Sequence, residues 1–301
     1  MTDEPENTGM RFGFIAVLGA PNAGKSTLIN RIVGAKVSIV SPKVQTTRTR
    51  VLGIMIQDKS QLVFVDTPGI FAPKKRLDRA MVDAAWKGAS DADLLALVVD
   101  SERGFDRNTR NIVANLKSDA VLILNKVDRV PREKLLALAQ SIHEAGKFRE
   151  TFMISALNGD GVDDLVAYFA AQVPAGIWMF PDDQLSDMPM RLMAAEIVRE
   201  QLFLQLHQEL PYALTVETED WKTLKDGSVR IAAVVIIERD SHKGMVLGKR
   251  GARIKEVGAT ARAELETMFD CKVHLFLHVK VRSDWKDKAE HYRALGLDFP
   301  S

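Results

Sequence analysis

The stretch "GAPNAGKS", residues 19–26, has the residue types and spacing that bind the phosphates of a nucleotide. It follows the apolar run "FGFIAVL" and precedes the helical pattern "STLINRIV". In such a loop the backbone N–H groups wrap the phosphates, the lysine reaches the β and γ oxygens, and the serine hydroxyl binds Mg²⁺. We therefore predict a nucleotide site that includes Gly19, Asn22, Ala23, Gly24, Lys25, Ser26 and Thr27.

Three further motifs, each at the end of an apolar strand pattern, favour a guanine nucleotide. In "DTPG", Asp66 can hold Mg²⁺ through water and the Gly69 N–H can meet the γ-phosphate. In "NKVD", the Asp128 carboxylate can accept both guanine N1–H and N2–H₂, which adenine does not offer. "SAL" can direct a backbone N–H at guanine O6. The base site is thus expected to contain Asn125, Lys126, Asp128, Ser155 and Ala156.

A polar segment between Gly34 and Arg50 contains two candidate switch threonines, Thr46 and Thr47. A GTP-dependent switch needs one threonine that bonds Mg²⁺ with its hydroxyl and the γ-phosphate with its N–H. The residues alone leave the choice open, and an ordinary polar loop is the alternative interpretation.

The elements that must position these motifs alternate between strand and helix through the first half. Strand patterns cover residues 12–19, 50–57, 61–69, 93–100, 120–128 and 151–157, and helical patterns cover 24–34, 108–117, 132–147 and 161–173. This alternation predicts an α/β fold with a mostly parallel sheet covered on both faces. The two adjacent strands at 50–69 predict one antiparallel edge.

The alternation ends at "VPAGIWMFPDDQLSDMP", whose prolines, glycine and three acids suit an interdomain linker. The second half then reads as helix, strand, strand, glycine loop, helix, strand and a short final helix, an α+β module. We expect a flexible tail at 1–10, a first domain at 11–175, a linker at 176–188 and a second domain at 189–301.

The stretch "KGMVLGKRGARIK" concentrates positive charge and raises the question of a second phosphate loop. Only three residues separate Gly244 from Gly248, and Arg250 stands where a Mg²⁺-binding hydroxyl would be required. Shifted in frame, "GKRG" is a G-x-x-G loop before a helix, the form that clamps a nucleic-acid backbone in KH domains. The predicted RNA contacts are Lys243, Val246, Leu247, Gly248, Lys249, Arg250, Gly251 and Arg253, with Val246 and Leu247 lining an apolar groove for bases.

Composition narrows the class of protein further. The longest apolar run has seven residues, whereas a membrane-spanning helix needs about 20. The single cysteine, Cys271, excludes an internal disulfide, so a cytoplasmic setting is expected. "CKVHLFLHVK" suggests a metal site, but His274 and His278 share one face of a strand and Cys271 points to the other, so we favour a partly exposed sheet face.

The motifs together resemble the translation-factor-related GTPases, and in particular the Era family. "GAPNAGKST", "QTTR", "DTPG", "NKVD" and "SAL" carry the resemblance, "QTTRTRVLGI" and "DTPGIFAPKK" most closely, and it runs through both halves. It implies a Ras-like P-loop GTPase domain with a mostly parallel sheet, followed by an α+β type II KH domain. It also implies that Thr47 binds Mg²⁺ together with Ser26 and Asp66, and that Asn22 holds a K⁺ ion.

The resemblance implies a GTPase that binds 16S ribosomal RNA near its 3′ end during assembly of the 30S subunit. It further implies a cytoplasmic monomer that associates loosely with the inner membrane. We expect Lys25, Thr47 and Gly69 to act in hydrolysis. Ile70 stands where Ras-like proteins place a water-orienting glutamine, so slow basal hydrolysis, stimulated by K⁺, is expected.

Two alternatives remain open at the level of the sequence. One is a tRNA-modification GTPase, which shares the "TTR" element but carries an acid after it, where this chain has Thr49. The other is a GTPase whose second domain docks a protein or a membrane partner instead of RNA.

Overall fold

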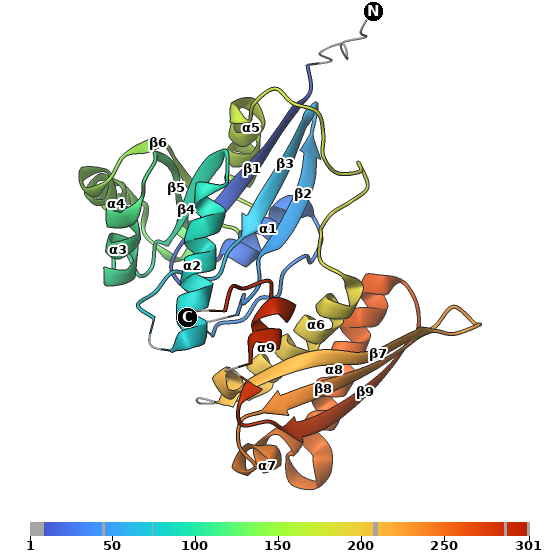
Figure 1. Ribbon diagram of the computed structural model, residues 1–301. Coiled ribbons are helices and arrows are strands. Elements are labelled where there is room, and N and C mark those ends of the chain that lie inside the picture. The colour runs from blue at the N-terminus through green and yellow to red at the C-terminus, as the bar shows by residue number, and fades with distance from the viewer. Residues whose placement is uncertain (1–8, 44–45, 74, 207–209, 286–287, 300–301) are drawn as a thin grey trace, which may run out of the picture. The chain divides into compact units, whose positions relative to one another are not determined.

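Packing divides the chain into two units that exchange short segments. The computed structural model describes residues 9–43, 46–73, 75–206, 210–285 and 288–299 (Figure 1). Unit 1 comprises Met1–Ser38, Thr47–Asp187 and Leu295–Ser301, and unit 2 comprises Ile39–Thr46 and Met188–Ala294. The predicted domains, 11–175 and 189–301, are contiguous ranges and do not contain these exchanges. Of the predicted tail at 1–10, residues 1–8 lie outside the described residues.

Unit 1 is built on a six-stranded sheet in the order β2-β3-β1-β4-β5-β6. All neighbouring strands are parallel except β2 and β3, so the predicted antiparallel edge is confirmed. Its strands are β1 Arg11–Leu18, β2 Val51–Gln57, β3 Ser60–Asp66, β4 Leu94–Asp100, β5 Ala120–Asn125 and β6 Phe148–Ile154. Its helices are α1 Lys25–Val33, α2 Arg76–Ser90, α3 Arg107–Asn115, α4 Arg132–Ala145 and α5 Val162–Gln172, with a 3₁₀ turn at Val127–Arg129.

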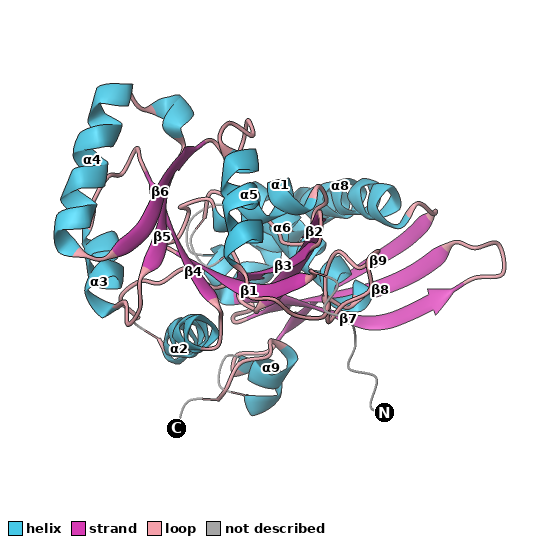
Figure 2. Cartoon of the chain, turned by 90° about the horizontal axis from the view of Figure 1, so that it is seen from above, coloured by secondary structure: helices cyan, strands magenta, loops and turns pink. Residues whose placement is uncertain are grey.

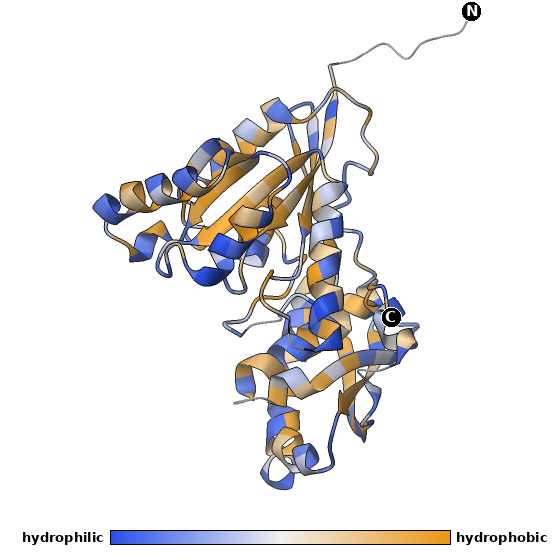
Figure 3. Ribbon diagram, turned by 60° about the vertical axis from the view of Figure 1, so that its left-hand side comes forward, coloured by the Kyte–Doolittle hydropathy of each residue, from blue (hydrophilic) through white to orange (hydrophobic). Residues whose placement is uncertain are grey.

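Alternate residues of each central strand serve two separate hydrophobic layers. In β1, Ile15 and Val17 pack in the layer under α1 and α5, whereas Ala16 and Leu18 pack in the layer that includes α2, α3 and α4. Figure 2 shows helices on both sides of the sheet, and Figure 3 shows its strands as the most apolar part of this unit. The predicted two-faced α/β layering is therefore confirmed.

The segment predicted as a linker is fastened to unit 1. Phe12 N–H donates to Pro174 O, and the Gln61 side chain bonds the backbone of Met179 and Phe180. Ile54 N–H donates to Leu185 O on the open side of β2. The bond at Ile54 occupies a backbone group on the edge strand β2 that would otherwise be unpaired.

Unit 2 has a three-stranded sheet in the order β7-β8-β9, with β7 and β8 antiparallel and β8 and β9 parallel. One face of this sheet packs on α6 and α8 around a single core. The elements are α6 Met190–Gln205, a 3₁₀ turn at Leu210–Ala213, β7 Leu214–Thr223, β8 Val229–Ile237, α7 Ser241–Leu247, a 3₁₀ turn at Lys249–Gly251, α8 Ala252–Phe269, β9 Val273–Val281 and α9 Ala289–Ala294.

None of the helices in the described ranges combines the length and apolar character that crossing a membrane requires. Two helices of the fold, α2 and α7, are absent from the sequence-based prediction. Leu77, Met81, Ala85 and Ala89 of α2 are buried at a spacing of four, so the signal for that helix is present in the sequence. The seven residues of α7 carry no comparable pattern.

Candidate functional site

The loop between β1 and α1 depends on backbone conformations that few residue types adopt. Gly24 has φ 97° and directly precedes α1, and a Cβ at this position would lie 2.2 Å from Asn125 Nδ2. Asn22 has φ 64°, a region where asparagine is enriched among non-glycine residues. The strand, loop and helix thus form the arrangement that binds anions through backbone N–H groups and a helix N-terminus.

Lys25 is buried against this loop. Its ammonium donates to Gly19 O and Ala20 O, each at 3.1 Å. Burial lowers the pKa of Lys25 from 10.5 to about 8, and the nearby charge of Asp66 opposes that shift. A phosphate oxygen beside the ammonium would favour its protonated form and bring the pKa up again.

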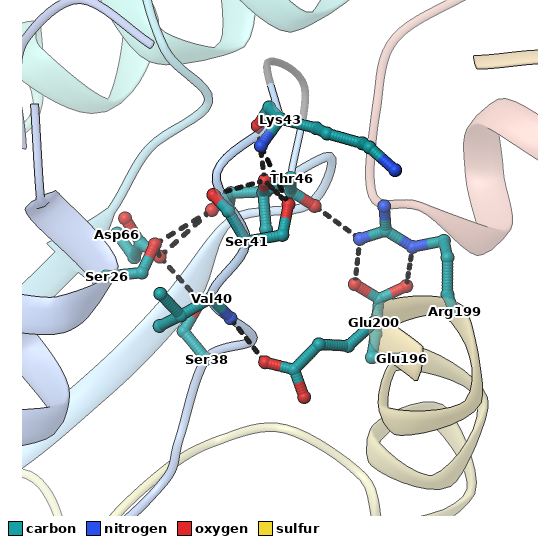
Figure 4. Close-up of polar contacts among 11 residues, drawn as sticks. Ser26, Ser38, Val40, Ser41, Lys43, Thr46, Asp66, Glu196, Arg199 and Glu200 are labelled. Carbon is teal, nitrogen blue, oxygen red and sulfur yellow. Dashed lines mark hydrogen bonds and ion pairs between the residues drawn. The ribbon is translucent and has the colours of Figure 1, made fainter. Parts of the chain in front are cut away.

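Four side-chain oxygens from three separate segments converge at the end of β3 (Figure 4). Asp66 Oδ2 accepts hydrogen bonds from Ser26 Oγ at 2.7 Å, Ser38 Oγ at 2.6 Å and Thr47 Oγ1 at 3.3 Å. Ser26 Oγ and Thr47 Oγ1 are 3.0 Å apart. Three of these residues belong to the predicted Mg²⁺ set, and Ser38 is an addition that the sequence motifs do not mark.

This cluster has the chemistry of a magnesium site. Asp66 Oδ1 is buried and has no hydrogen-bond partner among the described residues. Burial raises the pKa of the Asp66 carboxyl, while the Ser38 hydrogen bond and the Lys25 charge oppose the shift. Carboxylate and hydroxyl oxygens are the ligands that Mg²⁺ takes, with waters and substrate phosphates completing its shell. The residues present therefore fit the ion, which would also compensate the orphaned oxygen.

The structure separates the two candidate threonines. Thr47 lies in the oxygen cluster of unit 1, whereas Thr46 belongs to unit 2. Thr46 Oγ1 donates to Lys43 O at 2.7 Å and lies 2.7 Å from Ser41 Oγ. Only Thr47 is therefore placed to serve a metal beside Asp66.

The segment after β3 is held against the phosphate loop. Ile70 N–H donates to Gly19 O at 3.1 Å, and the Ile70 side chain is buried in the core. Gly69 is thereby kept next to the loop, as its predicted contact with the γ-phosphate requires. A buried isoleucine side chain presents nothing to an attacking water, which agrees with the expectation of slow basal hydrolysis.

Asn125 joins the base-recognition motifs to the phosphate loop. Its Nδ2 donates to Ala23 O at 2.8 Å, and its Oδ1 accepts from Ala156 N–H at 3.0 Å. A bond from that N–H to guanine O6 would therefore be shared with the bond to Asn125. Ser155 is buried, and its Oγ accepts from Asn158 N–H at 3.2 Å, which stabilises the "SAL" turn.

Lys126 directly precedes the 3₁₀ turn Val127–Arg129, and Asp128 lies within that turn. Lys126 has φ 66°, and its ammonium bonds Asp100 Oδ2 at 2.6 Å. Asp100 ends β4 and is absent from the predicted site, although its position at the end of a buried strand is visible in the sequence. The half-buried Asp128 carboxylate has Arg129 Nε at 3.9 Å.

The "GKRG" turn of unit 2 has an unusual backbone. Gly248 has φ 71° and ψ 177°, and a Cβ there would lie 2.7 Å from Arg253 Cβ. Arg250 has φ 53°, and Gly251 precedes α8. Lys243, Lys249 and Arg250 are exposed, so the turn displays cations at the N-terminus of an 18-residue helix.

One of the predicted RNA contacts needs correction. The Val246 side chain is 0% exposed within the core of unit 2, so it does not line a groove open to bases. Met245 beside it is 52% exposed and is the apolar side chain at that surface. Arg253 Nη1 donates to Met245 O at 2.9 Å, which ties α7 to α8. Leu247 is half-buried, as a groove residue could be.

The strand β9 shows the predicted alternation. Val273, Leu275, Leu277 and Val279 pack on the core of unit 2, whereas Phe276 and His278 are exposed. Within the described part of the chain, no three His, Cys, Asp or Glu side chains gather closely enough to hold a metal ion.

Comparison with known proteins defines the class of protein that this geometry belongs to. A family model described as 50S ribosome-binding GTPase matches residues 14–126, and a KH domain model matches residues 209–286. The chain is thus a P-loop GTPase joined to a KH domain, which confirms the predicted fold class.

Relatives aligned over the full chain define the family. GTPase Era of Sinorhizobium medicae is 57% identical and covers 99% of each chain. GTPase Era of Brucella suis is 56% identical over 99% of this chain and 97% of that protein. The chain belongs to the Era family, hydrolyses GTP, and uses guanine nucleotides with Mg²⁺.

Two solved structures resemble the whole chain, each at 38% identity and each covering 95% of this chain and 99% of the other. An Aquifex aeolicus Era variant bound to GDP and AlF₄⁻ gives a TM-score of 0.90. Era in complex with MgGDPNP and nucleotides 1506–1542 of 16S ribosomal RNA gives a TM-score of 0.91.

Proposed function

We propose that this GTPase binds 16S ribosomal RNA near its 3′ end, acts in assembly of the 30S subunit, and changes its RNA affinity with its nucleotide. The observation that carries the proposal is the exposed "GKRG" turn at the start of α8, in the same chain as the GTP site. Support comes from the solved relative that holds a 3′ segment of 16S RNA. A turn of this form clamps a sugar–phosphate backbone through close approach and charge.

Within the GTP site, we assign each residue by its place in the structure. Lys25 neutralises the β- and γ-phosphates, Ser26 and Thr47 are Mg²⁺ ligands, and Asp66 holds the ion through water. Gly69 directs its N–H at the γ-phosphate. Mg²⁺, when bound, supplies charge stabilisation for the transferred phosphoryl group. Water is the nucleophile, so the protein positions groups and stabilises charge but forms no covalent intermediate.

We also propose the finer features that the family resemblance implies. Asn22 holds a K⁺ ion against the phosphates, and the protein works in the cytoplasm as a monomer with peripheral association at the inner membrane. Single-turnover hydrolysis in K⁺ and in Na⁺ tests the ion, since equal rates would remove that role from Asn22. Cell fractionation with and without a high-salt wash tests the membrane association.

Charge reversal in the turn tests the RNA proposal. Filter binding of an RNA with the 3′ end of 16S RNA should weaken at least tenfold in the double variant Lys249→Glu/Arg250→Glu, because each lost cation contact removes favourable phosphate interaction. The matched control is Lys222→Glu/Lys225→Glu, which reverses two exposed charges at the β7–β8 end of unit 2. Equal RNA affinity in the turn variant and the wild type would instead support a protein-docking role for unit 2.

A further inference from the structure

The segment Ile39–Thr46 packs with unit 2, although both residues that flank it lie in the GTP site of unit 1. Ser38, just before it, bonds Asp66 Oδ2 at 2.6 Å, and Thr47, just after it, lies 3.3 Å from the same oxygen. The segment is only eight residues long. Its attachment in unit 2 therefore bears directly on where Thr47 can be.

The segment is attached to one helix, α6, by hydrogen bonds at three of its residues. Val40 N–H donates to Glu200 Oε1 at 2.7 Å (Figure 4). The Lys43 ammonium donates to the carbonyls of Phe203 and Leu206, which belong to the C-terminal end of that helix. Arg199 Nη2 donates to Thr46 O. Each bond has one ionised partner, so each is stronger than a bond between neutral groups.

The middle of this attachment is a buried ion pair. Arg199 and Glu196 are both buried, and Arg199 Nε donates to Glu196 Oε1 at 2.8 Å. The guanidinium also lies 4.9 Å from the centre of the Phe203 ring. A buried pair of this kind is weak evidence for stability, because desolvation offsets most of its attraction. Here the ion pair with Glu196 fixes the orientation of the Arg199 guanidinium, so that one of its N–H groups donates to the Thr46 carbonyl.

The helix α6 also contacts α8, the helix that begins at the proposed RNA-binding turn. Gln201 Nε2 lies 3.1 Å from Glu264 Oε2, and Gln205 Nε2 lies 3.3 Å from Thr260 Oγ1. Both partners are on α8, whose first residue follows Gly251 directly. The chain from Thr47 through α6 to α8 is therefore continuous in covalent and hydrogen-bonded contacts.

We propose that Lys43, Arg199 and Glu200 are positioning residues for GTP hydrolysis: they hold the Ile39–Thr46 segment so that Thr47 stays in the oxygen cluster with Ser26 and Asp66. This inference rests on the proposed role of Thr47 as a Mg²⁺ ligand. The same hydrogen bonds make α6 the element through which RNA on unit 2 and GTP on unit 1 affect one another.

The first test uses the full chain and the variants Glu200→Ala, Glu200→Gln and Lys43→Met. Glu200→Ala and Lys43→Met should slow single-turnover GTP hydrolysis about fivefold to tenfold and raise the Mg²⁺ concentration needed for half of the maximal rate. GDP affinity in EDTA should stay within about twofold, because Thr47 touches neither the base nor the β-phosphate in the assigned roles. Glu200→Gln keeps an acceptor for Val40 N–H and should recover most of the rate.

The controls separate positioning from general damage. Glu256→Ala removes an exposed carboxylate from α8 and should leave hydrolysis and Mg²⁺ dependence unchanged. Wild-type rates in Glu200→Ala and Lys43→Met would overturn the proposal, and so would a Glu200→Gln variant as slow as Glu200→Ala. Loss of GDP affinity in EDTA together with the rate would also overturn it, since it would indicate a disrupted nucleotide site.

A second arm measures coupling with the 3′-end RNA. In the wild type, RNA affinity should differ between the states with GDP and with a non-hydrolysable GTP analogue, and Glu200→Ala should bring the two affinities to within about twofold. An undiminished difference in Glu200→Ala would overturn the coupling role of α6. If the wild type does not bind RNA, the proposed function fails, whereas the hydrolysis measurements still decide the positioning role.

Discussion

Asp66 is the residue on which the GTP site converges, because the hydroxyls of three residues and the charge of Lys25 all act on its carboxylate. Ser26 comes from the phosphate loop, and Ser38 and Thr47 flank a segment that packs with unit 2. Burial shifts the pKa values of the two charged groups in opposite directions: it lowers the pKa of Lys25 and raises that of Asp66. Ligands that bring charge to either group will therefore move protons.

We predict that nucleotide binding takes up a proton at Lys25. The pKa of Lys25 is lowered to about 8 in the free protein. A phosphate beside it raises that pKa, so binding takes up roughly half a proton at pH 8, and affinity falls as the pH rises above 8. Calorimetry of GDP binding in EDTA, in two buffers of different ionisation enthalpy, measures the uptake without interference from Mg²⁺ at Asp66. No net proton uptake at pH 8 would contradict the prediction.

We predict that Asp128→Asn exchanges guanine for xanthine specificity. In the proposed base site the carboxylate would accept two guanine N–H groups, whereas an amide would donate to the carbonyl that xanthine carries at C2. Affinity for GDP should fall by roughly 100-fold, because charge-assisted bonds are lost in a half-buried site. Competition by GDP and XDP against a fluorescent nucleotide measures both changes. Asp160→Asn, a neighbouring exposed carboxylate, is the control and should keep its preference for GDP.

At the scale of elements, short pieces of backbone with positive φ shape the two turns for which we propose phosphate contacts. Gly24 and Gly248 both precede helical turns with positive φ, and in both a Cβ would lie under 3 Å from a neighbouring atom. Their ψ angles differ, at 22° for Gly24 and 177° for Gly248. The first leads straight into α1, and the second belongs to a region that essentially only glycine adopts.

We predict that Gly248→Ala weakens RNA binding about tenfold and leaves GTP hydrolysis without RNA unchanged. The added methyl group would meet Arg253 Cβ at 2.7 Å in a backbone conformation unsuited to alanine. Gly244→Ala is the matched control, since that glycine has no neighbouring atom within 4 Å and its φ is not positive. Filter binding with the 3′-end RNA compares the two. Equal weakening in both variants would mean that α7, and not the turn, is the sensitive element.

Element prediction from the sequence succeeded where periodicity and turn chemistry agree. The parallel sheet with its antiparallel edge follows from strand and helix alternation, and α8 follows from the glycine turn before it. The short helix α7 could not be predicted because its seven residues carry no periodic pattern and its end is tied to another helix, where Arg253 on α8 bonds Met245 O. Contacts of that kind arise only after the chain has folded.

For the whole molecule, the features most relevant to function are the two short segments that pack with the other unit from the chain around them. Ile39–Thr46 joins unit 2, and Leu295–Ser301 joins unit 1. In that returning segment Leu295 and Leu297 are buried, and Phe299 lies under the Arg76 guanidinium of α2 at 5.2 Å. The helix α2 follows the "DTPG" segment, so residues beyond the KH domain match pack against the helix next to that motif.

We predict reciprocal coupling between RNA and nucleotide. If RNA binds about tenfold more tightly to the GTP-analogue state than to the GDP state, RNA must raise the preference for the analogue over GDP by the same factor. Titrations of RNA at saturating nucleotide and of nucleotide at saturating RNA measure the two factors independently. RNA affinities that are equal in both nucleotide states would show that the units bind their ligands independently.

The sequence by itself identified the guanine nucleotide, the metal chemistry and the order of domains. Each of the motifs "GAPNAGKS", "DTPG", "NKVD" and "GKRG" is only a few residues long, so its backbone conformation depends mainly on its own residues. Only the tertiary structure decided that Thr47 and not Thr46 faces Asp66, that Ser38 joins them, and that Val246 is buried. It also decided that α6 grips the segment between Ser38 and Thr47. These contacts join residues up to about 160 positions apart, and such pairings depend on how whole elements pack, which no local pattern of residues encodes.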